Sequence, residues 1–257
     1  MSDLIKLSVS RTKTFADCKK KYDYQYNLKL PKKIWDHHIL GSCIHKILEE
    51  FHLHYLNGGT LKYNEAMKEA YLKGMEEFKD KLKPEMIAEI RSMADQYLRI
   101  VYKTKHHHVI SCEKPFSMMV REDINVNGAI DRIQIDPDGV YHVGDYKTVR
   151  NEKYLVNEFF QLETYAYVVY TEHPEITKVR ASYIMLRHGF KHITREIDLA
   201  TMLKIPGKFI DYAEKITAEK EFPATPTPLC DYCDFQEVCP YDIRKKASSK
   251  KKTLSWV

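Results

Sequence analysis

The chain has 257 residues, of which 44% are hydrophobic and 30% charged, and it carries a formal net charge of +5. This length and composition suit one mixed domain with an elaboration, or two small units, and disorder is not the default expectation. No apolar run approaches the roughly 20 residues that a membrane span needs, and the first ten residues lack the apolar segment of a signal peptide. We therefore expect a cytoplasmic protein, or a nuclear one, without a membrane partner; a phage-encoded chain would work in the host cytoplasm.

Apolar residues that recur at three- and four-residue steps predict amphipathic helices along much of the chain. The expected helices cover 11–26, 38–56, 63–82, 84–103, 156–170 and 199–218. From Val109 the pattern changes to alternation, which is typical of strands. The expected strands cover 109–121, 124–135, 140–147, 179–187 and 192–197. Turn residues at 136–139 predict that the first three strands form an antiparallel meander.

Two acids and a lysine meet on neighbouring strands of this meander. Asp131 lies on one strand, and Asp145 and Lys147 lie on the next, two residues apart and therefore on the same face. Phosphodiester hydrolysis needs such a set, because carboxylates hold metal ions that activate water and neutralise charge on the leaving oxygen. An isolated D-x-K tripeptide is more often a chance match with a strand-end salt bridge, so the context decides.

Three further residues supply that context. His45 lies on the helix over 38–56, where an imidazole could complete a metal site, although a lone helical histidine is more often packed or on the surface. Gln161 and Tyr165 are one helical turn apart on the helix that follows the third strand. Tyr165 is also readily explained as a core aromatic, like the other tyrosines of that helix.

Together these residues form four short motifs in a fixed order. The motifs are Gly41-x-x-x-His45, Gly128-x-x-Asp131, Asp145-x-Lys147 and Gln161-Leu162-Glu163-Thr164-Tyr165. The set resembles the RecB-like nucleases of the PD-(D/E)XK superfamily, over roughly 7–241 of this chain. The second acid here is Asp145, where many members of the superfamily have glutamate, and both acids bind hard cations through oxygen.

The resemblance implies an α/β fold with a PD-(D/E)XK nuclease core, in which a central mixed sheet is flanked by helices. It implies that His45, Asp131 and Asp145, joined by the backbone carbonyl of Tyr146, ligate Mg²⁺ or Mn²⁺. The catalytic residues that it implies are Asp131, Asp145, Lys147, Gln161 and Tyr165. Glu113 matches a glutamate that the superfamily often has at the corresponding place.

Four cysteines indicate a metal centre as well. Cys230, Cys233 and Cys239 are closely spaced, which is a metal-binding signature in a reducing compartment, and Cys18 can supply a fourth thiolate. The arrangement resembles the iron–sulfur RecB-like nucleases, including AddB-type helicase–nuclease subunits and CRISPR-associated RecB-like exonucleases. It implies a 4Fe–4S cluster that joins the two ends of the nuclease domain. Zinc on four thiolates is the alternative, because spacing alone rarely separates zinc from iron.

The expected organisation is a single iron–sulfur nuclease domain over 1–246, with an N-terminal helical elaboration. It contains a helical insertion at about 60–105 and a C-terminal cysteine-cluster segment at about 221–241. The lysine-rich end at 247–257 is expected to form a basic flexible tail. A basic balance of charge fits a polyanionic partner, although many basic proteins bind no nucleic acid.

The resemblance implies a metal-dependent DNA nuclease, acting as an exonuclease on single-stranded DNA ends in recombination, repair, replication or CRISPR-type DNA processing. The chain lacks the phosphate-binding loop of a helicase, so unwinding would come from a helicase, recombination or CRISPR protein partner. The alternatives are a non-catalytic DNA-binding or scaffold protein that keeps the fold and cluster, and a structural zinc protein with incidental acids. Intact Asp131, Asp145 and Lys147 argue against the scaffold, since a decayed site would lose at least one of them.

Overall fold

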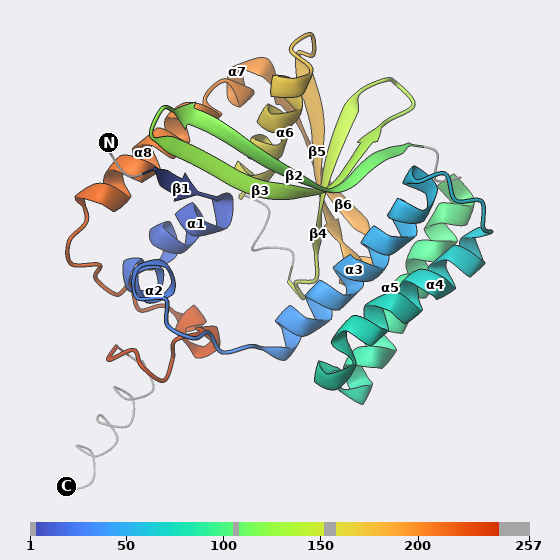
Figure 1. Cartoon of the computed structure of the whole chain (residues 1–257), viewed down its shortest axis with the longest axis horizontal. Coiled ribbons are helices and arrows are strands. Elements are labelled where there is room, and N and C mark those ends of the chain that lie inside the picture. Colours follow the sequence, from blue (N-terminus) through green and yellow to red (C-terminus); the bar gives the residue numbers. More distant parts are fainter. Residues whose placement is uncertain (1–3, 105–107, 152–157, 242–257) are drawn as a thin grey trace, which may run out of the picture.

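The structure is a computed structural model that describes residues 4–104, 108–151 and 158–241. Within these ranges the chain forms a mixed six-stranded sheet with helices on both faces (Figure 1). The strands are β1 (Ile5–Leu7), β2 (Val109–Arg121), β3 (Ile124–Ile135), β4 (Tyr141–Lys147), β5 (Lys178–Met185) and β6 (Lys191–Asp198). The expected α/β fold with a central mixed sheet is therefore confirmed.

The antiparallel meander predicted from the alternating pattern is the centre of this sheet. β2 pairs with β3, and β3 with β4, in antiparallel register, and Gly139 has a φ of 80° in the turn that closes the second hairpin. β4 then pairs with β5 in parallel, which requires the crossover through a helix between them. β6 lies antiparallel to β5. The bounds of β2 to β6 differ from the predicted ones by at most two residues.

The sequence pattern does not predict β1. This strand runs parallel to the start of β3, with Ile5 opposite Ile124 and Leu7 opposite Val126. β3 therefore has β1 and β4 along one edge and β2 along the other. Three residues are too few to display a period, and β1 forms because β3, more than a hundred residues later in the sequence, supplies its hydrogen-bonding partner.

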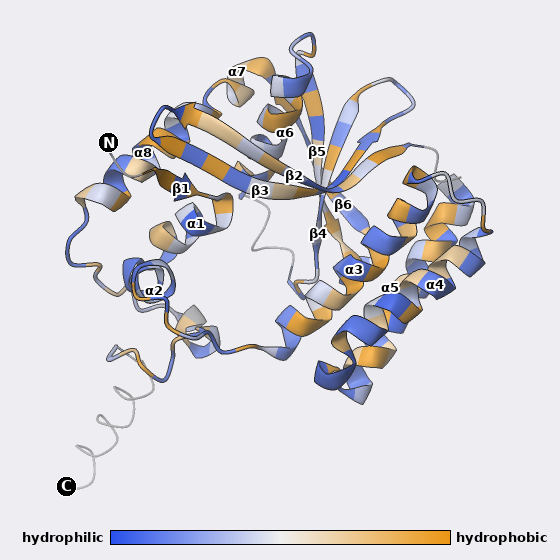
Figure 2. Cartoon of the chain, viewed as in Figure 1, coloured by the Kyte–Doolittle hydropathy of each residue, from blue (hydrophilic) through white to orange (hydrophobic). Residues whose placement is uncertain are grey.

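Three long helices cover one face of the sheet. α3 (Asp36–Leu56), α4 (Tyr63–Phe78) and α5 (Pro84–Thr104) lie side by side and share a buried apolar core with Tyr146 and Ile184 of the sheet (Figure 1). Hydrophobic and hydrophilic residues alternate in bands along each helix, as expected for helices with one buried side (Figure 2). Helices α4 and α5 lie within the predicted helical insertion.

The opposite face is covered by α6 (Phe160–Glu172), whose buried residues pack on the apolar side chains of β3, β4 and β5. The helix predicted over 199–218 is two helices, α7 (Leu199–Met202) and α8 (Ile205–Ala218). The break precedes Pro206, which has no N–H to donate and favours the first turn of a new helix. α8 packs against β1 and the start of β3.

The helix predicted at the N-terminus is broken at a cysteine. α1 (Val9–Asp17) ends at Cys18, whose backbone is extended with a φ of −160° and a ψ of 110°. α2 (Lys19–Tyr22) then begins, and it continues as a π-helical turn over Asp23–Asn27. The apolar stripe runs through the break, so the periodicity of the sequence does not reveal it.

Two predictions lie outside the described residues, namely the basic tail at 247–257 and the first residues of the helix expected over 156–170. In the ranges that the structure describes, no helix combines the length and the apolar character needed to cross a membrane.

Candidate functional site

The ladder between β3 and β4 stops at the two predicted acids. Its last pair is Arg132 opposite Gly144, and the next residues along the strands are Asp131 and Asp145. Instead of a further backbone pair, the side chain of Asp131 accepts the N–H of Tyr146 at 2.7 Å. A carboxylate thus takes the place of a strand carbonyl, and two buried acids lie at the end of the hairpin.

His45 and Glu113 complete a group of candidate metal ligands around Asp131. One ligand atom from each of the three lies within 4.8 Å of the other two. Nδ1 of His45 is 3.6 Å from Oδ2 of Asp131 and 3.9 Å from Oε1 of Glu113. Its Nε2 is 3.1 Å from the backbone carbonyl of Tyr146. Imidazole nitrogen and carboxylate oxygen are ligands for divalent cations, so this group could hold a metal ion.

Glu113 is the member of this group that the sequence motifs leave out of the ligand set. It lies on β2 between two residues that pair with Arg132 and Ile130, so the register of the hairpin sets it beside Asp131. Its backbone has a φ of 44°, a left-handed conformation that residues other than glycine rarely adopt. Such strain concentrates at functional sites. The pairing of the two predicted strands is the signal in the sequence that could have identified it.

The start of the His45 motif brings α3 close to the end of β4. A Cβ atom added at Gly41, one turn before His45, would lie 3.2 Å from Oγ1 of Thr148. This is tighter than ordinary packing, so a larger residue would require the Thr148 side chain or the helix to shift by a few tenths of an ångström. Glycine therefore allows the approach that holds the imidazole near the acids.

The charges in this group are strongly coupled. Burial, and then the charge of Asp145, raise the pKa of Asp131 to about 7. Burial acts to lower the pKa of His45, but the surrounding carboxylates, with Glu113 the largest contributor, outweigh it and raise the pKa. Several acids in a dry site repel one another, and a bound cation would relieve that repulsion.

Asp145 and Lys147 both face α6, as their two-residue spacing predicts. Nζ of Lys147 is 2.6 Å from Oδ2 of Asp145 and donates to Oε1 of Gln161 at 3.0 Å. The amide of Gln161 donates to the hydroxyl of Tyr165 at 2.8 Å, and that hydroxyl donates to Oδ1 of Asp145 at 3.4 Å. These four side chains close a ring of contacts, which we call the Asp145 ring. Tyr165 is buried, so it is at once a core aromatic and a member of the ring.

One atom of the Asp145 ring lacks a well-formed hydrogen bond. Among the described residues, buried Oδ2 of Asp145 accepts no hydrogen bond of good geometry, although the Lys147 ammonium is 2.6 Å away. A buried carboxylate oxygen is costly unless it is hydrogen-bonded or bound to a cation. The residues at this end of the sheet therefore fit a divalent metal ion.

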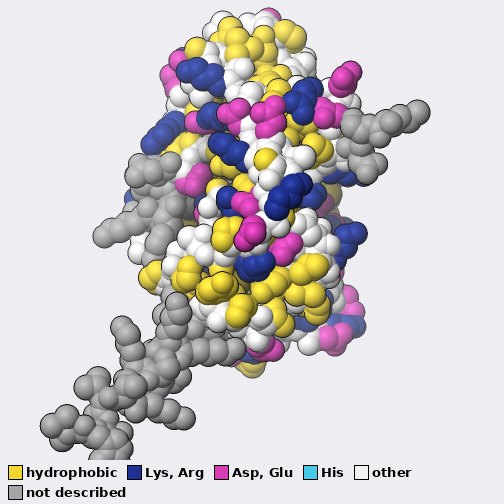
Figure 3. Space-filling model, turned by 90° about the vertical axis from the view of Figure 1, so that its left-hand side faces the viewer, with side chains coloured by type: hydrophobic (Ala, Val, Ile, Leu, Met, Phe, Trp, Pro, Cys, Tyr) yellow, Lys and Arg dark blue, Asp and Glu magenta, His cyan; other side chains and the backbone are white. Residues whose placement is uncertain are grey.

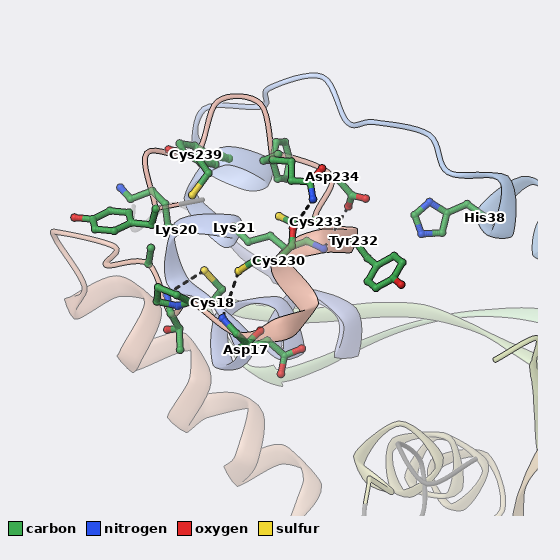
Figure 4. A pocket seen from close by; sticks show the side chains of 18 of the residues that line it. Asp17, Cys18, Lys20, Lys21, His38, Cys230, Tyr232, Cys233, Asp234 and Cys239 are labelled. Atoms are coloured by element: carbon green, nitrogen blue, oxygen red, sulfur yellow. Dashed lines mark hydrogen bonds and ion pairs between the residues drawn. The ribbon is translucent and has the colours of Figure 1, made fainter. Parts of the chain in front are cut away.

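A second group of potential ligands lies around a cavity of about 320 Å³. The cavity is lined by the four cysteines singled out in the sequence, Cys18, Cys230, Cys233 and Cys239 (Figure 4). The first comes from the break between α1 and α2, and the others come from the segment that follows Pro228, which contains a short 3₁₀ helix. The fold thus brings the two ends of the described chain to one cavity.

Backbone groups also face these sulfur atoms. The N–H of Thr225 donates to Sγ of Cys18 at 3.5 Å, and the N–H of Thr227 donates to Sγ of Cys230 at 3.4 Å (Figure 4). Hydrogen bonds of this kind stabilise thiolates and tune sulfur-ligated metal centres. Four thiol groups with facing N–H donors are a donor set that could hold a metal centre.

The cysteine segment is attached to the N-terminal helices by contacts of several kinds. The N–H of Lys33 donates to the carbonyl of Asp234 at 3.2 Å, and the ammonium of Lys21 lies 3.3 Å from the Asp234 carboxylate. The ring of Tyr22 stacks on Phe222, with centroids 5.9 Å apart and an interplanar angle of 3°. The approach of the two ends therefore does not depend on the cysteines alone.

A mixed sheet with buried acids, a lysine and a histidine at the strand ends defines a class of metal-dependent phosphodiesterases. The model of the PD-(D/E)XK nuclease superfamily matches residues 6–240, and the chain belongs to this superfamily. Its nucleases use divalent metal ions, in agreement with the group formed by His45, Glu113 and Asp131. No curated protein matches the chain.

Two solved structures are similar to this one. The crystal structure of a candidate exonuclease from Eubacterium rectale superposes with a TM-score of 0.56 and 13% identity, covering 98% of this chain and 93% of that one. At this identity the likeness concerns the fold alone. The crystal structure of SSO0001 has 20% identity and covers 88% of this chain and 94% of that one, but its TM-score of 0.39 supports no argument.

Proposed function

We propose that this protein is a metal-dependent DNA nuclease that degrades single-stranded DNA from its ends. The observation that carries the proposal is the convergence of His45, Glu113 and Asp131 within 4.8 Å, beside the lysine of the Asp145 ring. The preference for single-stranded ends rests on the resemblance to iron–sulfur RecB-like nucleases. It agrees with the description of the Eubacterium rectale protein as a candidate exonuclease.

Mg²⁺ or Mn²⁺ supplies Lewis acidity and an activated water when it is bound. In this proposal the ligands are His45, Asp131, Asp145, the backbone carbonyl of Tyr146 and, in addition, Glu113. Of these, His45, Asp131 and Glu113 lie within 4.8 Å of one another, and Nε2 of His45 is 3.1 Å from the Tyr146 carbonyl oxygen, a separation at which both atoms can bind one cation. The left-handed backbone at Glu113 costs free energy, and it is consistent with a side chain that must point toward the metal-ligand group.

Lys147 acts on the scissile phosphate. Its ammonium is held between Asp145 and Gln161, so it cannot swing freely toward solvent. In that position it stabilises the negative charge that develops on the phosphorus oxygens and orients the attacking water. Gln161 and Tyr165 are positioning residues, because they touch Lys147 and Asp145 and set the directions of both.

Cys18, Cys230, Cys233 and Cys239 hold a 4Fe–4S cluster in this proposal. Its support is the shared cavity and the N–H groups that face two of the sulfur atoms. When bound, the cluster links the two ends of the nuclease domain and has no part in hydrolysis. Its contribution is to the free energy of unfolding, because it closes a very long loop.

The cavity of about 320 Å³ has room for a polynuclear cluster. Zinc on the same four thiolates is the alternative, because zinc binds the same donors.

The proposal extends to the organisation of the chain and its partners. Residues 1–246 form one iron–sulfur nuclease domain of the AddB or CRISPR-associated type, and the protein works in the cytoplasm. Because the sequence contains no phosphate-binding loop of a helicase, strand separation comes from a helicase, recombination or CRISPR protein partner. DNA is the substrate in each of these settings.

The test is cleavage of DNA labelled at either end, as a single strand and as a duplex, with Mg²⁺ or Mn²⁺. Wild-type protein purified without oxygen is compared with Asp145→Ala and with Asp138→Ala, a matched acid in the exposed β3–β4 turn. We expect stepwise shortening of the single strand by wild type and Asp138→Ala, and none by Asp145→Ala.

The outcomes separate the parts of the proposal. Internal fragments without stepwise products would make the protein an endonuclease, and equal activity in Asp145→Ala would remove the proposed site. Binding of DNA without cleavage under any metal would favour a scaffold. The cluster is checked in the same preparations, because it absorbs visible light whereas zinc, with a full d-shell, does not.

A further inference from the structure

A second cavity, of about 420 Å³, begins at the Asp145 ring and extends away from the metal-ligand group. Lys147 and Gln161 form its inner end, and its walls come from α1, the start of α6 and one side of α8. The wall residues that matter for the argument are Lys13 on α1, Phe160 on α6, and Lys208, Tyr212 and Lys215 on α8. None of them belongs to the proposed hydrolytic machinery.

Lysines lie over aromatic rings along this cavity. The Lys147 ammonium is 5.4 Å from the ring centroid of buried Tyr183, at the inner end. Farther out, Lys208 lies 5.5 Å from the ring of Phe160, and Lys215 lies 5.9 Å from the ring of Tyr212. The two outer rings are only half-buried and their centroids are 6.1 Å apart. Each outer pair combines a flat apolar surface with a cation.

The spacing of the residues explains why they share a wall. Lys208, Tyr212 and Lys215 are separated by four and three residues on α8, so they project from one side of that helix. Phe160 is the first residue of α6, and its ring lies 5.0 Å from that of Phe209 and 6.1 Å from that of Tyr212 on α8. The start of α6 and α8 therefore contribute rings to the same wall.

Both acidic and basic side chains lie along the cavity, and Lys215 differs from the other lysines in its ion pairing. Lys13 pairs with Glu158 at 2.9 Å, and Lys208 pairs with Glu163 at 2.6 Å. Lys215 is exposed and has no ion-pair partner among the residues that the structure describes. Figure 3 shows the side of the molecule with α1 and α8, where basic and acidic side chains are interspersed. The cavity therefore offers local contacts for phosphates without a uniformly basic surface.

We propose that this cavity binds the nucleotides of a single-stranded DNA end next to the phosphate that is cut. Unpaired bases stack on Phe160 and Tyr212, and Lys215 contacts a backbone phosphate. Base stacking on aromatic rings beside a cationic track is the general way in which proteins hold single strands without reading their sequence. The inference rests on the proposed nuclease function, and it identifies which residues select the single strand.

The rings favour a single strand over a duplex. The cavity of about 420 Å³ lies in the range of small-ligand sites, roughly 300–1,000 Å³. The bases of a duplex are stacked on each other and cannot reach the rings, whereas unpaired bases can. In this inference the preference for single strands comes from the two aromatic rings of the wall.

The test is equilibrium binding, measured by fluorescence anisotropy with a labelled oligothymidylate in EDTA, so that no cleavage is needed. The protein is the full chain, purified without oxygen. Tyr212→Leu should bind at least about fivefold more weakly than wild type, the lower end of what loss of one base–aromatic stack costs. Tyr212→Phe, which keeps the ring, should bind like wild type. Tyr102→Leu, which removes an exposed ring on α5, is the matched control.

The phosphate contact has a separate signature in the dependence on salt. Loss of one contact to a single strand reduces the slope of log affinity against log salt by about 0.7. Lys215→Gln should show this reduction and Lys215→Arg should not. Tyr212→Leu should weaken binding without changing the slope. Lys79→Gln, which removes an exposed lysine at the end of α4, should leave both quantities unchanged.

The outcomes distinguish this inference from the proposed function. Equal affinities of Tyr212→Leu and Tyr102→Leu, or an unchanged slope in Lys215→Gln, would overturn the inference even in a protein that cleaves DNA. Weakened binding by Tyr212→Leu, in a protein that cleaves nothing, would support the cavity as a single-strand site and reject the nuclease. The affinity of Tyr212→Leu for a duplex is measured with an unlabelled duplex competitor. If it falls by as much as the affinity for the single strand, the inference is also overturned.

Discussion

The acid site and the cysteine cavity are built in opposite ways. His45, Glu113, Asp131 and Asp145 lie on a long helix and on three paired strands, whose backbone hydrogen bonds fix them before any ligand arrives. Three of the four cysteines lie in a segment whose regular structure is one short 3₁₀ helix. The first site is positioned by the sheet and helices, whereas the second is positioned by a few contacts between a segment with little regular structure and the N-terminal helices.

This difference predicts that the two sites fail independently. Loss of a side chain at the acid site should remove chemistry and leave the fold, because the strands pair mainly through backbone hydrogen bonds; Asp131, which accepts the N–H of Tyr146, is the acid that also joins two strands. Loss of a cysteine should instead release a segment that has little structure of its own, although Lys33 and Phe222 still attach it to the N-terminal helices. The following variants test that separation.

The largest expected effect is on stability. If the cysteines hold the proposed cluster, Cys18→Ser should lower the free energy of unfolding by about 5 kcal/mol, because the loop between the two ends of the domain would no longer be closed. Urea denaturation of protein kept under anaerobic conditions measures it. Cys43→Ala, a buried cysteine on α3 outside the cavity, should cost only about 1 kcal/mol. Equal losses in the two variants would mean that the cysteines at the chain ends have no linking role.

The next effect is on chemistry. Lys147→Ala should lower the single-turnover cleavage rate about 10²–10³-fold, as expected for loss of one group that stabilises transition-state charge. The visible absorbance and the urea midpoint should stay at their wild-type values. Lys178→Ala, on an exposed part of β5, is the control. A residual rate within tenfold of wild type would exclude Lys147 from the reaction.

A smaller effect is expected from the far side of the Asp145 ring. Tyr165→Phe removes the hydroxyl that lies between Gln161 and Asp145, and it should slow cleavage roughly 10–100-fold, the usual range for residues that orient metal ligands. The concentration of Mn²⁺ needed for half-maximal rate should rise as well. Tyr167→Phe, on the same helix, should change neither quantity. A loss of stability with unchanged Mn²⁺ dependence would instead make Tyr165 a core residue only.

The smallest effect is the dependence of metal binding on pH. The pKa of Asp131 is raised to about 7 by burial and by Asp145, and the protonated acid cannot bind a cation. A proton therefore competes with the metal below this pKa, and the apparent affinity for Mn²⁺ should be about tenfold weaker at pH 6 than at pH 8. The raised pKa of His45 acts in the same direction. Titration calorimetry of Mn²⁺ binding at pH 6 and pH 8 measures this difference. Asp131→Asn is the control and should bind Mn²⁺ weakly at both pH values.

Much of the fold follows from local sequence pattern. β2 to β6 and α3 to α5 are each long enough to display several periods of alternation or of helical spacing, and their bounds follow closely. The three-residue β1 and the break at Cys18 are different, because each depends on a segment far away in the sequence. β1 needs β3 as its partner, and the extended backbone of Cys18 faces the cysteine segment. No local pattern carries that information.

The candidate site shows the same division. His45, Asp131, Asp145 and Lys147 could be predicted because each belongs to a short motif with fixed spacing. Gly41, one turn before His45, is an example of such a motif partner. Glu113 has no such neighbour, and its place in the metal-ligand group depends on strand register and on a left-handed backbone. The cavity beside α8 likewise cannot be predicted from the sequence pattern, since its walls come from three helices that are far apart in the chain.

The hydrogen bonds of the Asp145 ring have a direction. Lys147 can only donate and an ionised Asp145 can only accept, so the amide of Gln161 has one allowed orientation, with its oxygen toward the lysine. The hydroxyl proton of Tyr165 must then point at Asp145. If a cation takes over that carboxylate oxygen, the hydroxyl loses its acceptor, but the amide keeps its orientation because the lysine still requires an oxygen facing it. The lysine thus sets the direction of the Tyr165 hydroxyl through an amide that lies between them.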